Sequence, residues 1–379
     1  MVEGALGTES EQTRSLREPK LNQVPPFGPL PAPAVRPSAQ FGHRGKAGGP
    51  AERRTVGGRP GGYAEKMTGD SRAVVSDMDS AAAVFAEVRP RLFGIAYRML
   101  GSPMDAEDIV QEVWLRWQAY DRATVRDPPA FLATVATRLS INATRSARAR
   151  REKYVGPWLP EPVDTSADPE LGAQRGEALE LAVLLLLEKL VPTERAAYVL
   201  REAFDYPYPQ IAGILQVREE NARQLVSRAR KHISTERSAP VGSDQQRRLL
   251  SAFLAAAQTG DLPALEQLLT ADVISYSDGG GAVRAAKIPV VGRTHVSRFV
   301  AAFAGHFWAG VTLTWLETNG QASVLVSRDH TAVAFVTAGA TADGIDRLLW
   351  VLNPAKLARF APVAELPESP EPRSAVAEG

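Results

Sequence analysis

The chain has 379 residues, enough for two or three domains, and 44% of them are hydrophobic, enough to build packed cores. Its 44 basic and 43 acidic residues give a net charge of +1, so net charge does not identify partners. The absence of cysteine excludes disulfide scaffolds, thiolate zinc sites and a cysteine nucleophile. The longest apolar run, residues 181–187, is far shorter than the roughly 20 residues that span a bilayer, so we expect a soluble cytoplasmic protein without a membrane partner.

The two ends of the chain differ from the rest in composition. Glycine and proline make up 21 of the first 70 residues, a level typical of low-complexity segments. We therefore expect residues 1–78 to be a disordered arm, or an extension created by a misplaced start codon with Met67 or Met78 as the true start. The tail over 361–379 is rich in proline and glutamate, and we expect it to be loose.

Helical periodicity marks residues 79–153. Apolar residues recur three and four positions apart over 85–99, Gly101-Ser102-Pro103 ends that helix, a second helix starts at Asp105, and a third covers about 130–145. These signals predict one all-α domain.

A proline-rich linker is predicted over 154–175, and a second helical domain over 176–238. In that domain a short helix over 209–215 and a tight turn lead into a helix over 218–233 with a polar, basic outer face. The apolar face of this helix is predicted to be Ala222, Leu225, Val226 and Ala229. This arrangement predicts a helix-turn-helix whose second helix enters the major groove. An ordinary helical hairpin is the alternative. Residues 138–153 form another basic cluster, which favours phosphate binding but also occurs at solvated helix ends.

The pattern changes after Pro240. Two helices, over 244–258 and 262–269, precede alternating strands, and in the strand over 311–316 every second residue is apolar. Helices followed by mostly antiparallel strands predict an α+β domain over 243–360.

Residues 80–237 resemble an extracytoplasmic-function (ECF) sigma factor of bacterial RNA polymerase, in the sigma-70 family. Residues 105–114, DAEDIVQEVW, resemble region 2.2, which holds core polymerase. Residues 131–139 and the basic stretch after them resemble regions 2.3 and 2.4, which open and read the −10 element. Residues 204–233 resemble region 4.2, which reads the −35 element. The resemblance implies promoter DNA and the β and β′ subunits of core polymerase as partners. Polymerase contacts are then expected from Asp105, Asp108, Gln111, Glu112 and Trp114. DNA contacts are expected from Arg138, Asn142, Arg145, Arg148, Arg150, Arg151, Arg218, Asn221, Arg223, Gln224, Ser227, Arg228 and Lys231.

Three further motifs resemble those of the sigma-J-like subgroup, which carries a fused SnoaL-like domain of the NTF2-like cone fold. They are WLPEP at 158–162, DGGG at 278–281 and NPAKL at 353–357. The subgroup associates this domain with control of the sigma factor, which implies regulatory contacts from Trp158, Pro160, Asp278, Gly279, Gly280, Asn353, Pro354 and Lys356. The expected fold is therefore multidomain: two all-α domains, the second with a helix-turn-helix, followed by an α+β cone domain.

Some positions depart from the family pattern, and some alternatives stay open. Arg218 stands where a capping serine or threonine is usual, Gln216 replaces a turn glycine, and Asn142-Ala143 replaces an expected Asp-Arg pair. Because cone folds also host isomerases and cyclases, a polyketide-cyclase-like enzyme or a small-ligand sensor remains the alternative for the last domain. Its acidic and histidine residues show neither dyad nor metal-ligand spacing, so we expect no catalytic residue, no metal and no cofactor. A helix-turn-helix regulator that works without polymerase is the other competing function.

Overall fold

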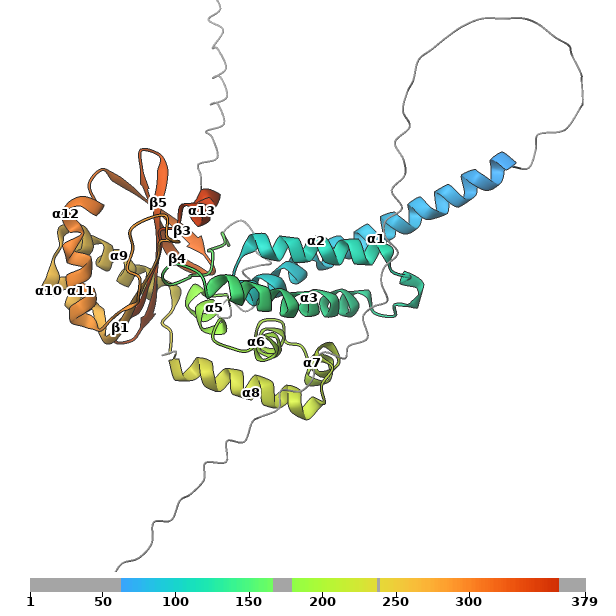
Figure 1. Cartoon of the computed structure of the whole chain (residues 1–379), viewed down its shortest axis with the longest axis horizontal. Coiled ribbons are helices and arrows are strands. Elements are labelled where there is room, and N and C mark those ends of the chain that lie inside the picture. The colour runs from blue at the N-terminus through green and yellow to red at the C-terminus, as the bar shows by residue number, and fades with distance from the viewer. Residues whose placement is uncertain (1–62, 166–178, 237–238, 361–379) are drawn as a thin grey trace, which may run out of the picture. The chain divides into compact units, whose positions relative to one another are not determined.

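The computed structural model describes residues 63–165, 179–236 and 239–360, with side chains from Met78 onward (Figure 1). Most of the expected N-terminal arm, the second half of the expected linker and the expected tail lie outside these ranges. Among the helices described, none combines the length and the apolar character needed to cross a membrane.

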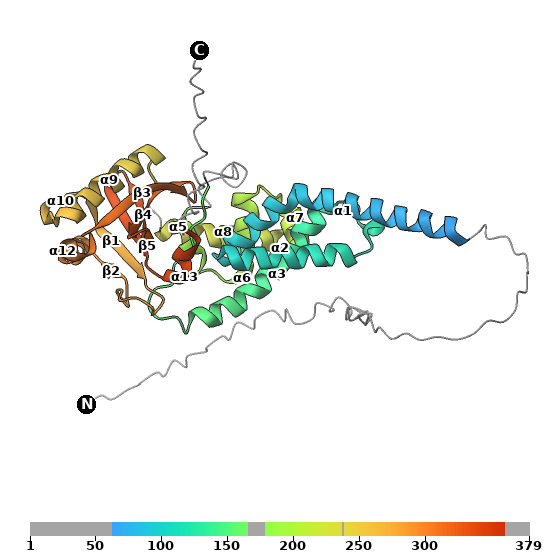
Figure 2. The same cartoon turned by 90° about the horizontal axis from the view of Figure 1, so that it is seen from above.

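Three helices form the first helical block (Figures 1 and 2): α1 (Tyr63–Leu100), α2 (Pro103–Ala119) and α3 (Pro128–Arg151). Helix α1 begins well before the expected start at residue 79, and α3 extends beyond its expected range at both ends. Helix starts follow local chemistry, because Ser102 and Asp127 accept N–H groups of the first turn and proline follows each of them.

The second helical block contains α5 (Leu181–Leu187), α6 (Pro192–Tyr198), a π-helical turn (Val199–Ala203), α7 (Tyr208–Leu215) and α8 (Glu219–Glu236). Its apolar side chains join those of the first block in one continuous hydrophobic core, which includes Leu92, Val113, Leu187 and Val226. We call this packing of the two helical blocks on each other the closed arrangement.

The C-terminal domain is a sheet covered by helices. Its helices are α9 (Ser243–Thr259), α10 (Leu262–Leu268), α11 (Arg293–Ala302), α12 (Ala304–Phe307) and α13 (Pro354–Leu357), with a 3-10 turn at Ala358–Phe360. Its strands are β1 (Leu269–Asp278), β2 (Val290–Val291), β3 (Val311–Thr318), β4 (Gln321–Arg328), β5 (Thr331–Thr341) and β6 (Gly344–Val351). The strand order is β2-β1-β6-β5-β4-β3, with β1 and β6 parallel and the other pairs antiparallel. This architecture confirms the predicted fold class.

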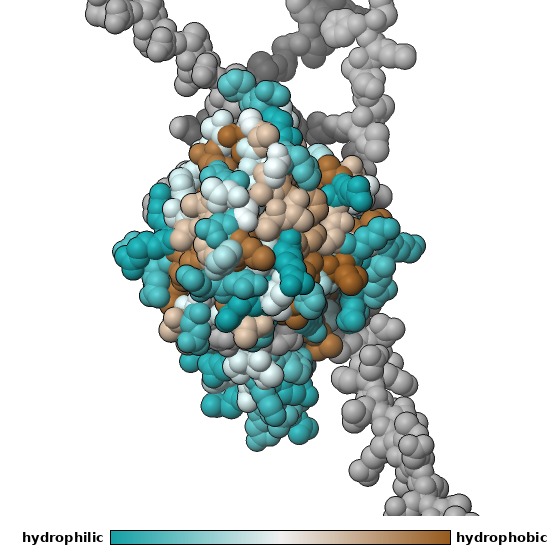
Figure 3. Space-filling view, turned by 90° about the vertical axis from the view of Figure 1, so that its left-hand side faces the viewer, coloured by the Kyte–Doolittle hydropathy of each residue, from teal (hydrophilic) through white to brown (hydrophobic). Residues whose placement is uncertain are grey.

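The two faces of the sheet have different partners. One face packs on α9, α10 and α11 around Phe253, Val324 and Val336. The opposite face, with Phe335 and Leu349, forms a smaller core with Leu159 and with Leu181 of α5. The sheet is therefore packed directly on the helical blocks. Figure 3 views the C-terminal domain end on and shows apolar and polar side chains interspersed over its surface.

Candidate DNA- and polymerase-binding surfaces and the domain junction

Helix α8 presents the predicted reading face to solvent. Ala222, Leu225, Val226 and Ala229 are buried in the core, as the periodicity predicted. The candidate DNA-binding residues of this segment are all exposed: Arg218, Asn221, Arg223, Gln224, Ser227, Arg228 and Lys231. In the turn before α8, Gln216 takes a left-handed conformation with φ of 55°, where glycine is favoured. The turn therefore keeps its shape with glutamine in place of glycine, at a cost in backbone strain.

Three arginines on α8 hold carboxylates of this chain. Arg223 Nη2 lies 2.5 Å from Glu219 Oε1, one turn away on the same helix. Arg228 Nε lies 3.0 Å from Glu194 Oε1. Arg230 Nη2 lies 2.7 Å from Glu202 Oε1. The side chains of Arg228 and Arg230 are more than half exposed, whereas the Glu194 side chain is 10% and the Glu202 side chain 24% exposed. Moving Arg228 away would therefore leave a largely buried carboxylate without this partner.

Helix α3 exposes most of its basic stretch but not its first member. Asn142, Arg145, Arg148 and Arg150 are exposed. By contrast, Arg138 donates from Nε to the carbonyl of Ile214 at 3.0 Å, and from Nη2 to the carbonyl of Gly213 at 3.3 Å. These carbonyls belong to the last turn of α7, where a cation complements the helix dipole. In the closed arrangement Arg138 therefore holds the helix-turn-helix, and its contact with DNA stays a prediction.

Arg151 is also bound by the protein itself. Its side chain is 14% exposed, pairs with Glu188, donates to the carbonyl of Leu100 and lies 3.5 Å from the centroid of the Trp158 ring. The other oxygen of Glu188 accepts from Arg195 at 2.6 Å. Burial lowers the pKa of Arg151 to about 9. The partners of Arg151 thus lie in both helical blocks, and its contact with DNA stays a prediction.

The expected polymerase contacts on α2 divide into free and engaged groups. Asp108 and Gln111 are exposed. Asp105 pairs with Arg150 at 3.1 Å, and Glu112 pairs with Arg116.

Trp114 lies half-buried, with its ring centroid 4.9 Å from that of Phe85, so it serves mainly in packing. Two residues that the sequence did not single out, Met104 and Leu115, are 69% and 54% exposed. With Asp108 and Gln111 they lie three or four positions apart, so the four residues form one stripe along α2. Exposed apolar side chains beside polar ones are typical of a protein-binding surface.

The three sequence motifs meet around one buried carboxylate, which we call the Asp278 junction. Asp278 is fully buried; Oδ1 accepts from the Tyr154 hydroxyl at 2.6 Å, and Oδ2 accepts from the Leu159 amide at 2.9 Å and from Lys356 Nζ at 2.7 Å. Asn353 Nδ2 donates to the Tyr154 hydroxyl at 2.7 Å. Burial lowers the pKa of Lys356, although the neighbouring carboxylate opposes that shift. The junction thus joins the linker to the end of β1 and to α13 by direct polar contacts.

The remaining motif residues shape this junction. Lys356 Nζ lies 4.3 Å from the centroid of the Trp158 ring, and Pro160 is buried. Gly280 has φ of 60°, and a Cβ there would lie 2.3 Å from Asn353 Nδ2. A Cβ at Gly279 would lie 2.7 Å from a backbone carbonyl. Pro354 is exposed and begins α13.

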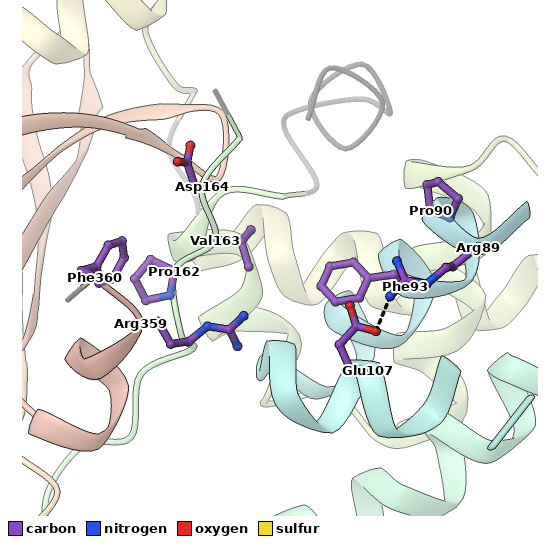
Figure 4. A pocket seen from close by; sticks show the side chains of 9 residues that line it. All are labelled: Arg89, Pro90, Phe93, Glu107, Pro162, Val163, Asp164, Arg359 and Phe360. Atoms are coloured by element: carbon purple, nitrogen blue, oxygen red, sulfur yellow. Dashed lines mark hydrogen bonds and ion pairs between the residues drawn. The ribbon is translucent and has the colours of Figure 1, made fainter. Parts of the chain in front are cut away.

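A cavity of about 390 Å³ opens where the first helical block, the linker and the end of the C-terminal domain meet (Figure 4). Figure 4 shows Arg89 paired with Glu107 on one side and Arg359 beside Phe360 on the other. The lining carries charges of both signs, so it does not select a ligand of one charge. The lining residues are Arg89, Pro90, Phe93, Glu107, Pro162, Val163, Asp164, Arg359 and Phe360.

Comparison with known proteins matches both helical blocks to known families. The sigma-70 region 2 family matches residues 84–150, and the sigma-70 region 4 family matches residues 180–233. Two helical blocks of this kind, in this order, define a sigma-70-type transcription initiation factor. The chain belongs to the ECF RNA polymerase sigma factors. We refer to the first helical block as region 2 and the second as region 4.

Two relatives and one solved structure illustrate the similarity. The ECF RNA polymerase sigma factor SigJ of Mycobacterium tuberculosis is 38% identical over 232 residues, which cover 60% of this chain and 74% of that protein. The probable ECF RNA polymerase sigma factor SigI of the same species is 34% identical over 208 residues, covering 54% and 72%. The crystal structure of M. tuberculosis SigJ matches with a TM-score of 0.60 at 31% identity, covering 73% of this chain and 98% of that one. The predicted membership of the ECF sigma factor family and the predicted cone-like, SnoaL-like C-terminal domain are both confirmed.

Sequence reasoning missed two residues that the structure places at the domain contacts. Tyr154 is central to the Asp278 junction, and its only sequence signal was its position just before the WLPEP motif. Asn319 contacts three other segments, but Asn319-Gly320 between two strands predicts a hairpin turn and nothing more.

Proposed function

We propose that region 2 binds core polymerase and the −10 element while region 4 docks α8 at the −35 element. The main support for assigning the −35 element to region 4 is the surface of α8. Its apolar stripe is buried, and every candidate base- or phosphate-contacting side chain on it is exposed. We infer that Asn221, Arg223 and Gln224 read base edges, and that Arg228, Arg230 and Lys231 hold phosphates.

Core polymerase, through its β and β′ subunits, is the proposed partner of the α2 stripe. Asp108 and Gln111 supply polar contacts there, and Met104 and Leu115 supply apolar area that is exposed in the free chain. Burial of such side chains at about 25 cal/mol per Å² would contribute to binding.

We propose that the closed arrangement is a resting state controlled by the C-terminal domain. The −10 and −35 positions differ by about 25 nucleotides, or about 85 Å of B-DNA at 3.4 Å per step. Regions 2 and 4 share one hydrophobic core here, and Arg138 and Arg151 are occupied by protein groups. The chain must therefore open to engage both promoter elements, and the Asp278 junction opposes opening because it ties the linker to the C-terminal domain.

The C-terminal domain is proposed to act by contact rather than by catalysis. The best-placed carboxylate for a general base, Asp278, is bound by three donors and fully buried. Turnover of an enone or polyketide substrate that is lost in Asp278→Ala would instead favour the enzyme alternative.

Run-off transcription with purified core polymerase tests the proposal. We compare the full chain, a truncation after Arg237 and a deletion of residues 353–357 on the same promoter. Promoter-specific transcripts from the full chain, and a marked change in their yield in both variants, are the expected results. Equal yields from all three would contradict control by the C-terminal domain. Tight binding to duplex promoter DNA without any initiation would favour the polymerase-independent regulator.

A further inference from the structure

The turn between β3 and β4 contacts the helical blocks through one side chain. Asn319 is 1% exposed and has φ of 54°, so both its backbone and its amide group are held in a defined position. It belongs to none of the three motifs that form the Asp278 junction.

The side-chain amide of Asn319 forms hydrogen bonds with three different segments of the chain. Oδ1 accepts from the backbone N–H of Val163 in the linker at 2.9 Å. Nδ2 donates to the hydroxyl of Tyr97 on α1 at 2.8 Å, and to the carbonyl of Leu179, just before α5, also at 2.8 Å. The backbone N–H of Asn319 donates to the carbonyl of Val163 at 3.0 Å. One residue of the C-terminal domain thus binds region 2, the linker and the start of region 4.

Tyr97 extends this set of contacts. Its hydroxyl donates to the carbonyl of Glu161 at 2.6 Å while it accepts from Asn319. The side chain is fully buried, and burial raises the pKa of the phenol, so the hydroxyl stays neutral and able to both donate and accept.

We propose that Asn319 is a positioning residue that clasps regions 2 and 4 to the C-terminal domain at a second point, separate from the Asp278 junction. The Asp278 junction holds the linker alone, whereas Asn319 holds α1 and the beginning of region 4 as well. Separating the helical blocks therefore requires release of the β3–β4 turn, even when the Asp278 junction has opened. The consequence for transcription rests on the proposed function, but the contact itself does not.

The chain offers a matched pair of variants. Asn319→Gly removes the amide group, and glycine adopts the left-handed conformation without strain. Asp329→Gly is the control, because Asp329 lies in the next hairpin turn, between β4 and β5, has φ of 48° and is exposed. Any effect of glycine on chain flexibility is common to both variants.

Amide hydrogen exchange of the full chain, read by mass spectrometry, measures release of the clasp directly. Peptides covering 159–165 and 179–187 are expected to exchange about tenfold faster in Asn319→Gly, because leaving one buried hydrogen-bonding group unsatisfied shifts an equilibrium by that order. Peptides from α2 and β5 are expected to exchange as in the wild type, and Asp329→Gly is expected to change neither set. Exchange in 159–165 and 179–187 at the wild-type rate, or uniform acceleration across the whole chain, would overturn the clasp.

A double-mutant cycle separates a clasp from a merely structural role. If the Tyr97–Asn319 hydrogen bond is part of the clasp, Tyr97→Phe combined with Asn319→Gly accelerates exchange by less than the product of the two single effects, because both changes remove that same hydrogen bond. Additive effects would show that the two residues act independently and would contradict the proposal. A wild-type chain that fails to initiate transcription would contradict the proposed function and leave the exchange result standing.

Discussion

Replacing Asp278 by alanine tests the energetic centre of the domain contacts. The change removes the carboxylate that is paired with Lys356, and it leaves the Tyr154 hydroxyl and the Leu159 amide without their acceptor. Because the side chains of Asp278 and Lys356 are 0% and 6% exposed, water does not compensate for these losses.

The size of the effect follows from this burial. Removing one partner of a buried ion pair costs about 3–5 kcal/mol, because the remaining charge stays in a low-dielectric site. An exposed pair would cost at most about 1 kcal/mol. We therefore expect Asp278→Ala to lower the free energy of unfolding of the full chain by about 3–5 kcal/mol.

Urea titration followed by far-UV circular dichroism measures this loss. The informative companion is Asp278→Ala combined with Lys356→Met, in which the uncompensated ammonium is replaced by an apolar group. Since the penalty lies mainly in the uncompensated charge, the double variant is expected to be more stable than Asp278→Ala alone. A loss below about 1 kcal/mol in the single variant, or a double variant that is less stable still, would refute the reasoning.

Three further predictions concern other groups. Gly280→Ala is expected to loosen the junction, since a Cβ at φ of 60° would lie 2.3 Å from Asn353 Nδ2, and limited proteolysis in the linker should be faster than in the wild type. Arg223→Ala is expected to weaken promoter binding by about 1–3 kcal/mol and to relax the preference at one base pair. Lys231→Ala is expected to weaken binding to all DNA sequences alike and to lower the slope of log binding constant against log salt concentration by about one. Fluorescence anisotropy on promoter variants at several salt concentrations distinguishes the two effects. Burial, followed by the neighbouring carboxylate, raises the pKa of the Tyr154 phenol, while a released tyrosine has the ordinary value of 10.0. The stabilisation from this phenol is therefore fully present below pH 10 and is lost as pH rises above it, and ultraviolet titration of tyrosinate should show one fewer late-ionising phenol in Tyr154→Phe.

Several features were predictable because they depend on local sequence. Apolar spacing in α8 identified Ala222, Leu225, Val226 and Ala229 as its buried stripe, and the alternation in β3 assigned Val311, Leu313 and Trp315 to one face. Short elements were harder to predict from the sequence. Strand β2 has two residues, too few to show alternation, and α11 was not predicted. The parallel pairing of β1 with β6 also carries no local signal, because both strands have the same period as their antiparallel neighbours.

The sequence by itself determined the family, the helix-turn-helix and the identity of the three motif segments of the linker and the C-terminal domain, because these depend on residue types at fixed spacing. Only the tertiary structure decided which basic residues are free. Arg138, Arg145 and Arg151 look alike along the chain, yet Arg145 is exposed while the other two bind groups of region 4. A cation's role depends on the carboxylate or carbonyl brought next to it by folding, and for Arg138 and Arg151 those partners lie far away in sequence.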